Sequence, residues 1–331
     1  MAVRTGPVAG AGGARLRSLT GAEPSAYRAH PLHSPERSYQ ETNCYTDVLI
    51  ELLHARGLEP LAMLGHLVRM DFEGDQWTFF KPPPEDLEAL FAVDIHEMQP
   101  YRPIPLQIEE QLARDRTLIV ELDAWFLPDT AATSYRSAHV KTSIAADAID
   151  REREVLRYFH NTGLHELSGD DYRGAFGLDP YPPVVLPPYT EIARFDSGSP
   201  ATGDALRAEA RRILAHHLAH RPRRNPFESF GEALERALPE LLAGTLDDYH
   251  AYAFATVRMC GAAFELLASH VAWVLEGSAQ GPLGAMDEIV ERCKTLSFRL
   301  ARRKAFDPRP ALEAAAAAWA QTMSGLEESV A

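Results

Sequence analysis

The stretch that decides the fold is Asn43-Cys44-Tyr45-Thr46-Asp47-Val48-Leu49-Ile50-Glu51-Leu52-Leu53-His54-Ala55-Arg56-Gly57, which has the pattern of one amphipathic helix. Its apolar residues recur at the three- and four-residue spacing of a single helical face. Asn43 is a favoured N-cap residue, and Gly57 is a favoured residue just after a helix end. Cys44 therefore falls in the first turn, where unpaired N–H groups and the helix dipole stabilise a thiolate. The alternative is that Cys44 is a small packing residue.

Composition limits the classes of function. The chain has 331 residues, 46% of them hydrophobic, so it is long enough for two domains or one large one with a substantial core. Its formal net charge of -14 argues against nucleic acid as a partner. We expect no membrane span and no secretory signal, because no sufficiently long apolar run is apparent and none follows the N-terminal arginines. Three cysteines without a CxxC pair suit a reducing, cytoplasmic location without disulfides or a cysteine zinc site.

The chain divides into three parts by pattern. Residues 1–37 are rich in Gly, Ala, Pro and Ser, which predicts a mobile tail. Residues 38–195 mix helical and strand patterns, and residues 196–331 show helical patterns alone. The predicted fold class is therefore α+β, with an all-helical C-terminal domain.

A second helical pattern follows Gly57, and short runs such as 76–80 and 94–98 read as strands. A buried strand is predicted at 117–123, and a further strand at 139–146 runs into a charged turn at 150–154. The chain then returns along a strand that ends at His160-Asn161.

A hairpin with this turn brings its two ends together, so His139 should lie close to Asn161. If the Cys44 helix packs against that edge, the three residues form a nucleophile, a general base and an orienting group. The imidazole of His139 would exchange the proton, and Asn161 would orient the ring. The alternatives are a structural histidine at His139 and an ordinary turn residue at Asn161.

This order of residues resembles the papain-like cysteine enzymes, and more closely the butirosin-biosynthesis "protein H" acyltransferases. The resemblance covers about residues 38–195 and rests on the segments 43–47, 120–128 and 134–140, together with the strand pair through Asn161. The whole chain also resembles an uncharacterised bacterial family, the domain of unknown function 1839. The resemblance implies a papain-like catalytic domain that takes an acyl or aminoacyl group from a carrier protein's phosphopantetheine thioester.

Two departures from the papain pattern bear on the site. The oxyanion glutamine of that family lies further from its cysteine than Gln40 lies from Cys44. The backbone N–H of Cys44 is therefore expected to do more of that work. The Gly-Tyr-Asp turn of the family is replaced by residues 147–150, so His160 is the alternative to Asn161. Asp123, at the end of the buried strand, is a candidate supporting residue. The simpler alternative is a structural role in which Asp123 hydrogen-bonds a loop.

No motif predicts a metal site or a bound cofactor. His216 and His220 have helical i, i+4 spacing, but no carboxylate motif accompanies them, which favours a solvated helix end. Cys260 and Cys293 lie in apolar helical patterns and are expected in the core.

Two basic clusters stand out on this acidic chain and are either solvated surface or docking patches for an acidic carrier protein. They consist of Arg221, Arg223 and Arg224, and of Arg302, Arg303 and Lys304.

The sequence and the resemblance together predict a cysteine-dependent acyltransferase with a small-molecule amine or alcohol acceptor. A cysteine peptidase or amidase on the same residues is the alternative among enzymes. A non-catalytic binding module with the same fold is the alternative outside them.

Overall fold

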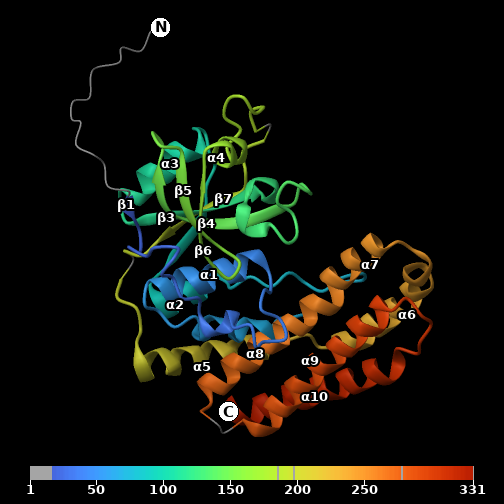
Figure 1. Ribbon diagram of the computed structural model, residues 1–331. Helices are drawn as coiled ribbons and strands as arrows, with labels where there is room; N and C mark the ends of the chain where they lie inside the picture. The colour runs from blue at the N-terminus through green and yellow to red at the C-terminus, as the bar shows by residue number, and fades with distance from the viewer. Residues whose placement is uncertain (1–16, 185, 197, 277–278, 331) are drawn as a thin grey trace.

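A computed structural model describes the chain except residues 1–16, 185, 197, 277–278 and 331. The N-terminal part combines a sheet with helices, and the part from residue 203 onward is built from helices (Figure 1). The predicted α+β class with a helical C-terminal region is confirmed.

The sheet is antiparallel throughout and runs in the order β2-β7-β3-β4-β5-β6, with β1 added to the far half of β4. The central strand β4 is buried along most of its length, as its run of alanine and isoleucine requires. The strands are β1 Arg17–Ser18, β2 Asp94–Glu97, β3 Arg116–Asp123, β4 Lys141–Asp150, β5 Val155–His160, β6 Gly163–Ser168 and β7 Thr190–Arg194.

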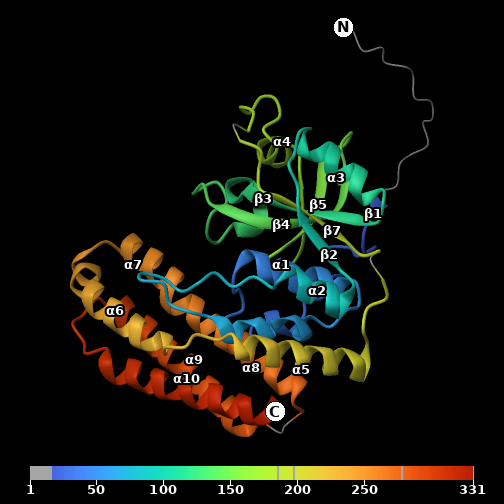
Figure 2. The same ribbon diagram turned by 180° about the vertical axis from the view of Figure 1, so that it is seen from behind.

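Helices cover both faces of the sheet. The predicted helix at Cys44 is confirmed as α1, Cys44–Ala55, which packs on β4 and β5. With α2, Pro84–Phe91, it lies between the sheet and the C-terminal helices, whereas α3, Ile104–Leu112, and α4, Asp170–Ala175, lie on the far side (Figures 1 and 2). Short 3-10 segments join these elements: η1 Pro31–His33, η2 Pro60–Arg69, η3 Ala124–Phe126 and η4 Pro128–Thr130.

Some local predictions were wrong. The run 76–80 forms only one bridge, Phe72 to Trp77, and the Trp77 ring packs against Phe227 and Phe230 of the helical part. The second helical pattern is the 3-10 segment η2, and both β6 and α4 were missed. His139 precedes β4, which begins at Lys141.

The predicted mobile tail is wrong for residues 17–37, and residues 1–16 lie outside the described part. β1 pairs with β4, and Leu19 and Leu32 are buried. Polar contacts hold this segment in place: the His30 N–H and the His33 ring bind carboxylates of α1. Composition alone does not reveal these contacts.

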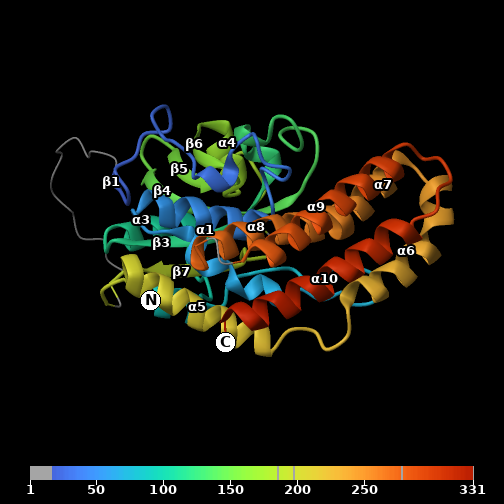
Figure 3. The same ribbon diagram turned by 90° about the horizontal axis from the view of Figure 1, so that it is seen from below.

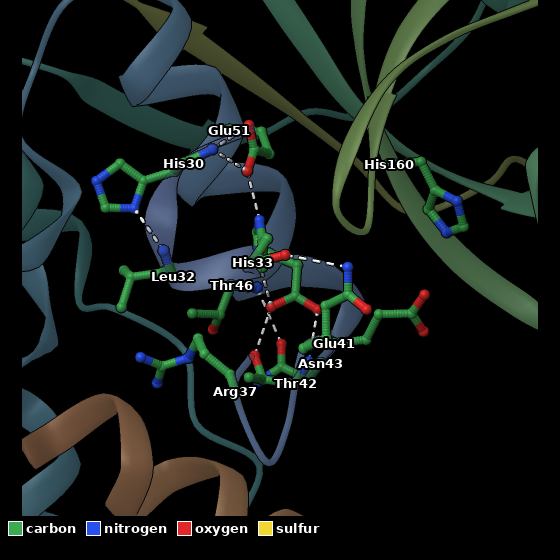
Figure 4. A network of polar contacts seen from close by, with 12 residues as sticks. His30, Leu32, His33, Arg37, Glu41, Thr42, Asn43, Thr46, Glu51 and His160 are labelled. Atoms are coloured by element: carbon green, nitrogen blue, oxygen red, sulfur yellow. Dashed lines mark hydrogen bonds and ion pairs between the residues drawn. The ribbon is translucent and has the colours of Figure 1, made fainter. Parts of the chain in front are cut away.

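His33 is buried between two carboxylates of α1 (Figure 4). One ring nitrogen contacts Glu51, and Nε2 lies 3.3 Å from Asp47. Burial alone would lower its pKa, but hydrogen bonds and charges from both carboxylates raise the pKa of His33 to about 9. An imidazolium thus fixes the N-terminal segment on the helix that carries Cys44.

The C-terminal helices form an elongated bundle in which α9 and α10 lie side by side (Figure 3). They are α5 Gly203–Ala219, α6 Pro226–Ala243, α7 Leu246–Ala253, α8 Met259–Val274, α9 Gln280–Ala301 and α10 Arg309–Val330, with a π-helical turn, η5, at Phe254–Arg258. The predicted core positions of Cys260 and Cys293 are confirmed.

The expectation of no membrane-span candidate needs correction. The continuous helix Leu246–Val274 is long and apolar enough by length and composition, with a mean hydropathy of 1.2. Over half of that window, 56%, is buried inside the protein, as in the core helix of a bundle. Its apolar character is accounted for by packing.

The helical part also binds residues 38–41, the segment that leads into Cys44. The carboxylate of Glu265, on α8, accepts backbone N–H groups of Ser38 and Tyr39, each at 2.9 Å. Arg258 donates to the Glu41 carbonyl at 2.6 Å. A Cβ at Gly261 would lie 2.3 Å from the Tyr39 hydroxyl, so glycine is required for this close approach.

Candidate functional site

Cys44 is the first residue of α1, as the capping pattern predicted. The Asn43 side chain accepts the Thr46 N–H at 2.9 Å and donates to the Phe80 carbonyl at 3.0 Å, which fixes the cap. The Asp47 N–H bonds the Asn43 carbonyl. The N–H groups of Cys44 and Tyr45 have no acceptor among the described residues, so they are free to bind an anionic oxygen.

The neighbour of the Cys44 thiol is a serine. Cys44 is half-buried, and its Sγ lies 3.8 Å from Oγ of Ser143 on β4. Ser143 is the cross-strand partner of Glu121 on β3, so these two side chains share the face of the sheet that α1 covers. Cys44, Ser143 and Glu121 therefore form a row across the sheet.

A second polar group lies beside this row and centres on Glu191 of β7. Its carboxylate accepts the Tyr45 and Tyr189 hydroxyls at 2.6 Å each, and it pairs with Lys81 at 2.5 Å. The Lys81 ammonium also sits 4.1 Å from the centre of the Tyr45 ring. Burial and the adjacent Glu191 raise the pKa of both tyrosines, so their hydroxyls remain hydrogen-bond donors.

The predicted general base, His139, is held by Asp123 and Trp125. Its Nδ1 lies 2.6 Å from the Asp123 carboxylate, and its ring stacks on Trp125 with centroids 4.5 Å apart. His139 precedes Ser143 by four residues, which is about 13 Å along an extended chain. The structure thus joins His139 to the predicted supporting residue Asp123, and it brings Ser143 rather than His139 to the Cys44 sulfur.

The two residues predicted as alternatives for the orienting role, Asn161 and His160, do not lie beside the Cys44 thiol in the structure. Asn161 lies in the turn between β5 and β6, with a φ of 46°. His160 is buried, and its two ring nitrogens lie 2.5 Å from Asp129 and 2.7 Å from Thr142. Thr142 and Ser143 are consecutive in β4, so their side chains lie on opposite faces of the sheet. The His160 pair is therefore across the sheet from Cys44, and Figure 4 shows His160 apart from the α1 network.

Gln40 is committed elsewhere. Its side-chain amide donates to the His33 carbonyl at 3.0 Å. In this conformation the hydrogen-bond donors left free beside Cys44 within the described chain are the N–H groups of the first helical turn.

The two basic clusters differ in how far acidic groups neutralise them. Arg221 pairs with Glu327 at 2.7 Å, and Arg224 pairs with Glu228 and Glu232. In the second cluster, Arg302 stacks on Phe298 at 5.1 Å and Arg303 donates to the Gly244 carbonyl.

Arg223 and Lys304 have no ion pair within the described part of the chain. The cluster of Arg302, Arg303 and Lys304 thus keeps more of its positive charge than the cluster of Arg221, Arg223 and Arg224.

A cavity of about 650 Å³ opens at the end of β3. Apolar and proline residues form most of its wall, which Glu121, Leu122 and Asp123 of β3 complete. This volume is in the range of small-molecule sites. Among the described residues, no group of three His, Cys, Asp or Glu side chains has the arrangement of a metal site.

Sequence reasoning missed Ser143, Glu121, Lys81, Tyr189 and Glu191. Glu121 and Asp123 alternate at the end of a buried strand, a signal that two carboxylates share one face. The other four come together only through the strand register and the position of α1.

Comparison with protein-family models gives two matches that together cover most of the chain. The DUF1839 N-terminal domain matches residues 28–195, and the DUF1839 C-terminal domain matches residues 203–328. The boundary between them coincides with the change from mixed structure to helices. No curated protein matches the chain.

Proposed function

The chain belongs to the DUF1839 family, and we propose that it is a cysteine-dependent acyltransferase with a papain-like catalytic domain. Cys44 accepts an acyl or aminoacyl group from a thioester and passes it to an amine or alcohol. The observation that carries this proposal is the thiol at the helix N-terminus, with free N–H groups beside it and a hydroxyl as its neighbour.

The neighbour of the thiol distinguishes two reactions. Cleavage of an amide expels an amine, which needs a proton from a general acid such as an imidazole. Exchange between thioesters expels a thiolate, which leaves without that proton. Ser143, and no imidazole, lies within hydrogen-bonding distance of the Cys44 sulfur among the described side chains. This arrangement favours transfer from a thioester over peptide hydrolysis.

Stabilisation of the tetrahedral intermediate comes from the backbone. The N–H groups of Cys44 and Tyr45 have no other acceptor in the described chain and point out of the first turn of α1. An oxyanion formed on the thioester carbonyl accepts both bonds and lies at the positive end of the helix dipole. The thiolate of the donor then leaves, and the acyl group remains on Cys44.

The donor we propose is the phosphopantetheine arm of an acyl or peptidyl carrier protein in a reducing, cytoplasmic compartment. Carrier proteins are acidic, and so is this chain, so docking needs a local basic patch. Of the two clusters, Arg302, Arg303 and Lys304 retain more free charge and are the preferred patch.

The test is acylation of the protein by an N-acetylcysteamine thioester, followed by intact-mass measurement. We expect one acyl group per chain, absent in Cys44→Ala and retained in Cys260→Ala. Cys44→Ala should keep the melting temperature nearly unchanged, since one half-buried sulfur contributes about 1 kcal/mol or less. Peptide cleavage without acyl transfer would support the alternative of a cysteine peptidase. An unreactive Cys44 would support the alternative of a non-catalytic binding module.

His139 provides a second discriminating variant. If the donor reaction needs no proton from an imidazole, His139→Ala should still acylate at Cys44 at a rate within about threefold of the wild type. A loss of several orders of magnitude would mean that His139 reaches Cys44 during the reaction and that the papain-type triad operates.

A further inference from the structure

A groove of about 550 Å³ lies between the helical part and the segment that leads into Cys44. Residues 38–41 form one side of it, and Glu41 is three residues from Cys44, so their Cα atoms are at most about 11 Å apart. This volume is in the range of small-molecule sites. The other side of the groove is formed by α7, η5 and α9, through Tyr249, His250, Ala253, Phe254, Arg258 and Ser297.

Arg258 supplies the positive charge of the groove. Its Nη2 donates to the Glu41 carbonyl at 2.6 Å, and its guanidinium lies 5.6 Å from the centre of the Phe254 ring. Both partners belong to the wall, so the guanidinium lies there too. Within the described chain no carboxylate pairs with Arg258, and its buried Nε has no hydrogen-bond partner. A guanidinium with unused donors calls for an acceptor from a ligand, and an anion forms the strongest bonds with it.

The local structure around Arg258 is unusual. The π-helical turn η5 holds Phe254 and Arg258 together, and such turns are rare and occur frequently at functional sites. Phe254 is 54% exposed, and Phe298 of α9 is 60% exposed. Aromatic and arginine side chains are enriched at the contact surfaces between proteins. The rim of the groove therefore has the composition of a docking surface.

The groove adjoins the basic cluster of Arg302, Arg303 and Lys304. Ser297 of its wall lies on α9, and Arg302 follows at the end of the same helix, about 7 Å further along the axis. Between them, Phe298 stacks with the Arg302 guanidinium at 5.1 Å. Positive charge thus continues from the groove to the patch proposed for the carrier protein.

Cys44 lies within the length of a phosphopantetheine arm from Arg258. The guanidinium contacts the Glu41 carbonyl, and Glu41 is at most about 11 Å from Cys44. From phosphorus to sulfur the arm has about 13 bonds in line, the reach of about four extended residues, or roughly 15 Å. A phosphate on Arg258 therefore leaves enough chain for the thioester carbonyl to reach the Cys44 sulfur.

We infer that this groove binds the phosphopantetheine arm of the donor, with the phosphodiester on Arg258, and that the carrier protein docks on Phe298 and the adjoining basic cluster. The inference rests on the proposed function for the identity of the donor. The phosphodiester supplies the anionic acceptor that Arg258 lacks. Polar wall residues such as His250 and Ser297 suit the amide groups of the arm, and the basic cluster complements an acidic carrier body.

The first experiment measures binding without turnover, in the full chain carrying Cys44→Ala. The probes are 4′-phosphopantetheine and pantetheine, which share the arm and differ only in the phosphate, titrated by NMR or calorimetry. We expect phosphopantetheine to bind at least about tenfold more tightly than pantetheine, as a charged hydrogen bond requires.

Arg258→Gln should remove this preference, because its amide still donates to the Glu41 carbonyl but carries no charge. Arg211→Gln is the matched control and should keep the preference. Arg211 likewise donates to a backbone carbonyl, that of Ser329, but it lies on α5, outside the groove. Thermal melts identify a variant that fails to fold. In that case Ser297→Trp decides, since it fills the groove from a half-exposed position and should abolish binding of both probes.

A second measurement identifies the source of the arm, because coenzyme A carries the same phosphopantetheine group. The probe is the holo acyl carrier protein of fatty-acid synthesis. The double variant Arg302→Glu, Lys304→Glu should weaken binding of this protein about tenfold and leave phosphopantetheine binding unchanged. Binding of coenzyme A without any binding of the holo carrier protein would overturn the carrier as the source.

Equal affinity for phosphopantetheine and pantetheine, no binding of either, or a preference that survives in Arg258→Gln would each overturn the inference. The inference and the proposed function fail separately, because binding is measured without the Cys44 sulfur. If Cys44 accepts an acyl group from the N-acetylcysteamine thioester but the arm does not bind, the groove is wrong and the proposed function stands. Binding of the arm together with an unreactive Cys44 in the wild type would refute the proposed function and leave the arm site established.

Discussion

Acid should destabilise this protein through two buried histidines, His66 of η2 and His270 of α8. Each is buried, donates its Nδ1 proton to a backbone carbonyl, and leaves Nε2 without a partner among the residues that the structure describes. Burial is the main cause that lowers the pKa of each ring from 6.5 to about 4. Both rings are therefore neutral in the folded protein at pH 7.

The sign follows from proton binding. Between pH 6.5 and 4 the unfolded chain binds a proton at each histidine and the folded chain does not, so stability is full above pH 6.5 and falls toward pH 4. At about 1.4 kcal/mol for each pH unit, a lowering of about 2.5 units corresponds to about 3 kcal/mol for each histidine. Two such groups amount to about 6 kcal/mol, which is comparable with the whole stability of many domains, about 5–15 kcal/mol.

The assay is urea unfolding followed by circular dichroism at pH 7.5, 5.5 and 4.5, which cover most of the window between pH 6.5 and about 4 in which the histidines titrate. The double variant His66→Asn, His270→Asn keeps a donor near each Nδ1 but cannot titrate. It should be less stable than wild type at pH 7.5 and lose much less stability on acidification. His250→Asn, at an exposed position, is the control and should behave as wild type. If wild type and the double variant lose the same stability between pH 7.5 and 4.5, the buried histidines are not the cause and the reasoning is refuted.

Three further predictions follow from the fold. The pKa of His33 is raised to about 9, so the stability that it contributes is full below pH 6.5 and is lost as pH rises through 9. In His33→Gln the urea midpoint should therefore depend less on pH between pH 7 and 9.5 than in the wild type. The same pH dependence in both proteins would remove His33 from the network. Gly261→Ala should cost about 1–3 kcal/mol by displacing Tyr39, whereas Gly281→Ala, with open space at its Cβ, should be neutral or stabilising; similar melting temperatures would contradict this contrast. Deletion of residues 1–16 should leave the melting temperature unchanged, but deletion of residues 1–33 should lower it by about 10 °C or abolish soluble expression, because it exposes the α1 carboxylates; equal melts for both truncations would mean that the segment contributes nothing.

Local patterns in the sequence were enough to predict the helix at Cys44. The cap at Asn43, the apolar face through Leu52 and the stop at Gly57 act within a few residues of each other, so no distant part of the chain is needed. The strand that ends at Asp123 and the C-terminal helices were predictable for the same reason, since each carries its own period.

Tertiary structure decided which residue meets the reactive sulfur. A two-residue period predicts that His139 and Ser143 point to the same face of an extended segment. It does not tell how far along the strand the end of α1 falls, because that depends on how the helix packs over β4 and β5. The packing places Ser143 at Cys44 and leaves His139 with Asp123. The docking of the segment around His33 on α1 has a similar origin: a buried imidazolium between two carboxylates is a pairing of distant residues, and no local pattern encodes it.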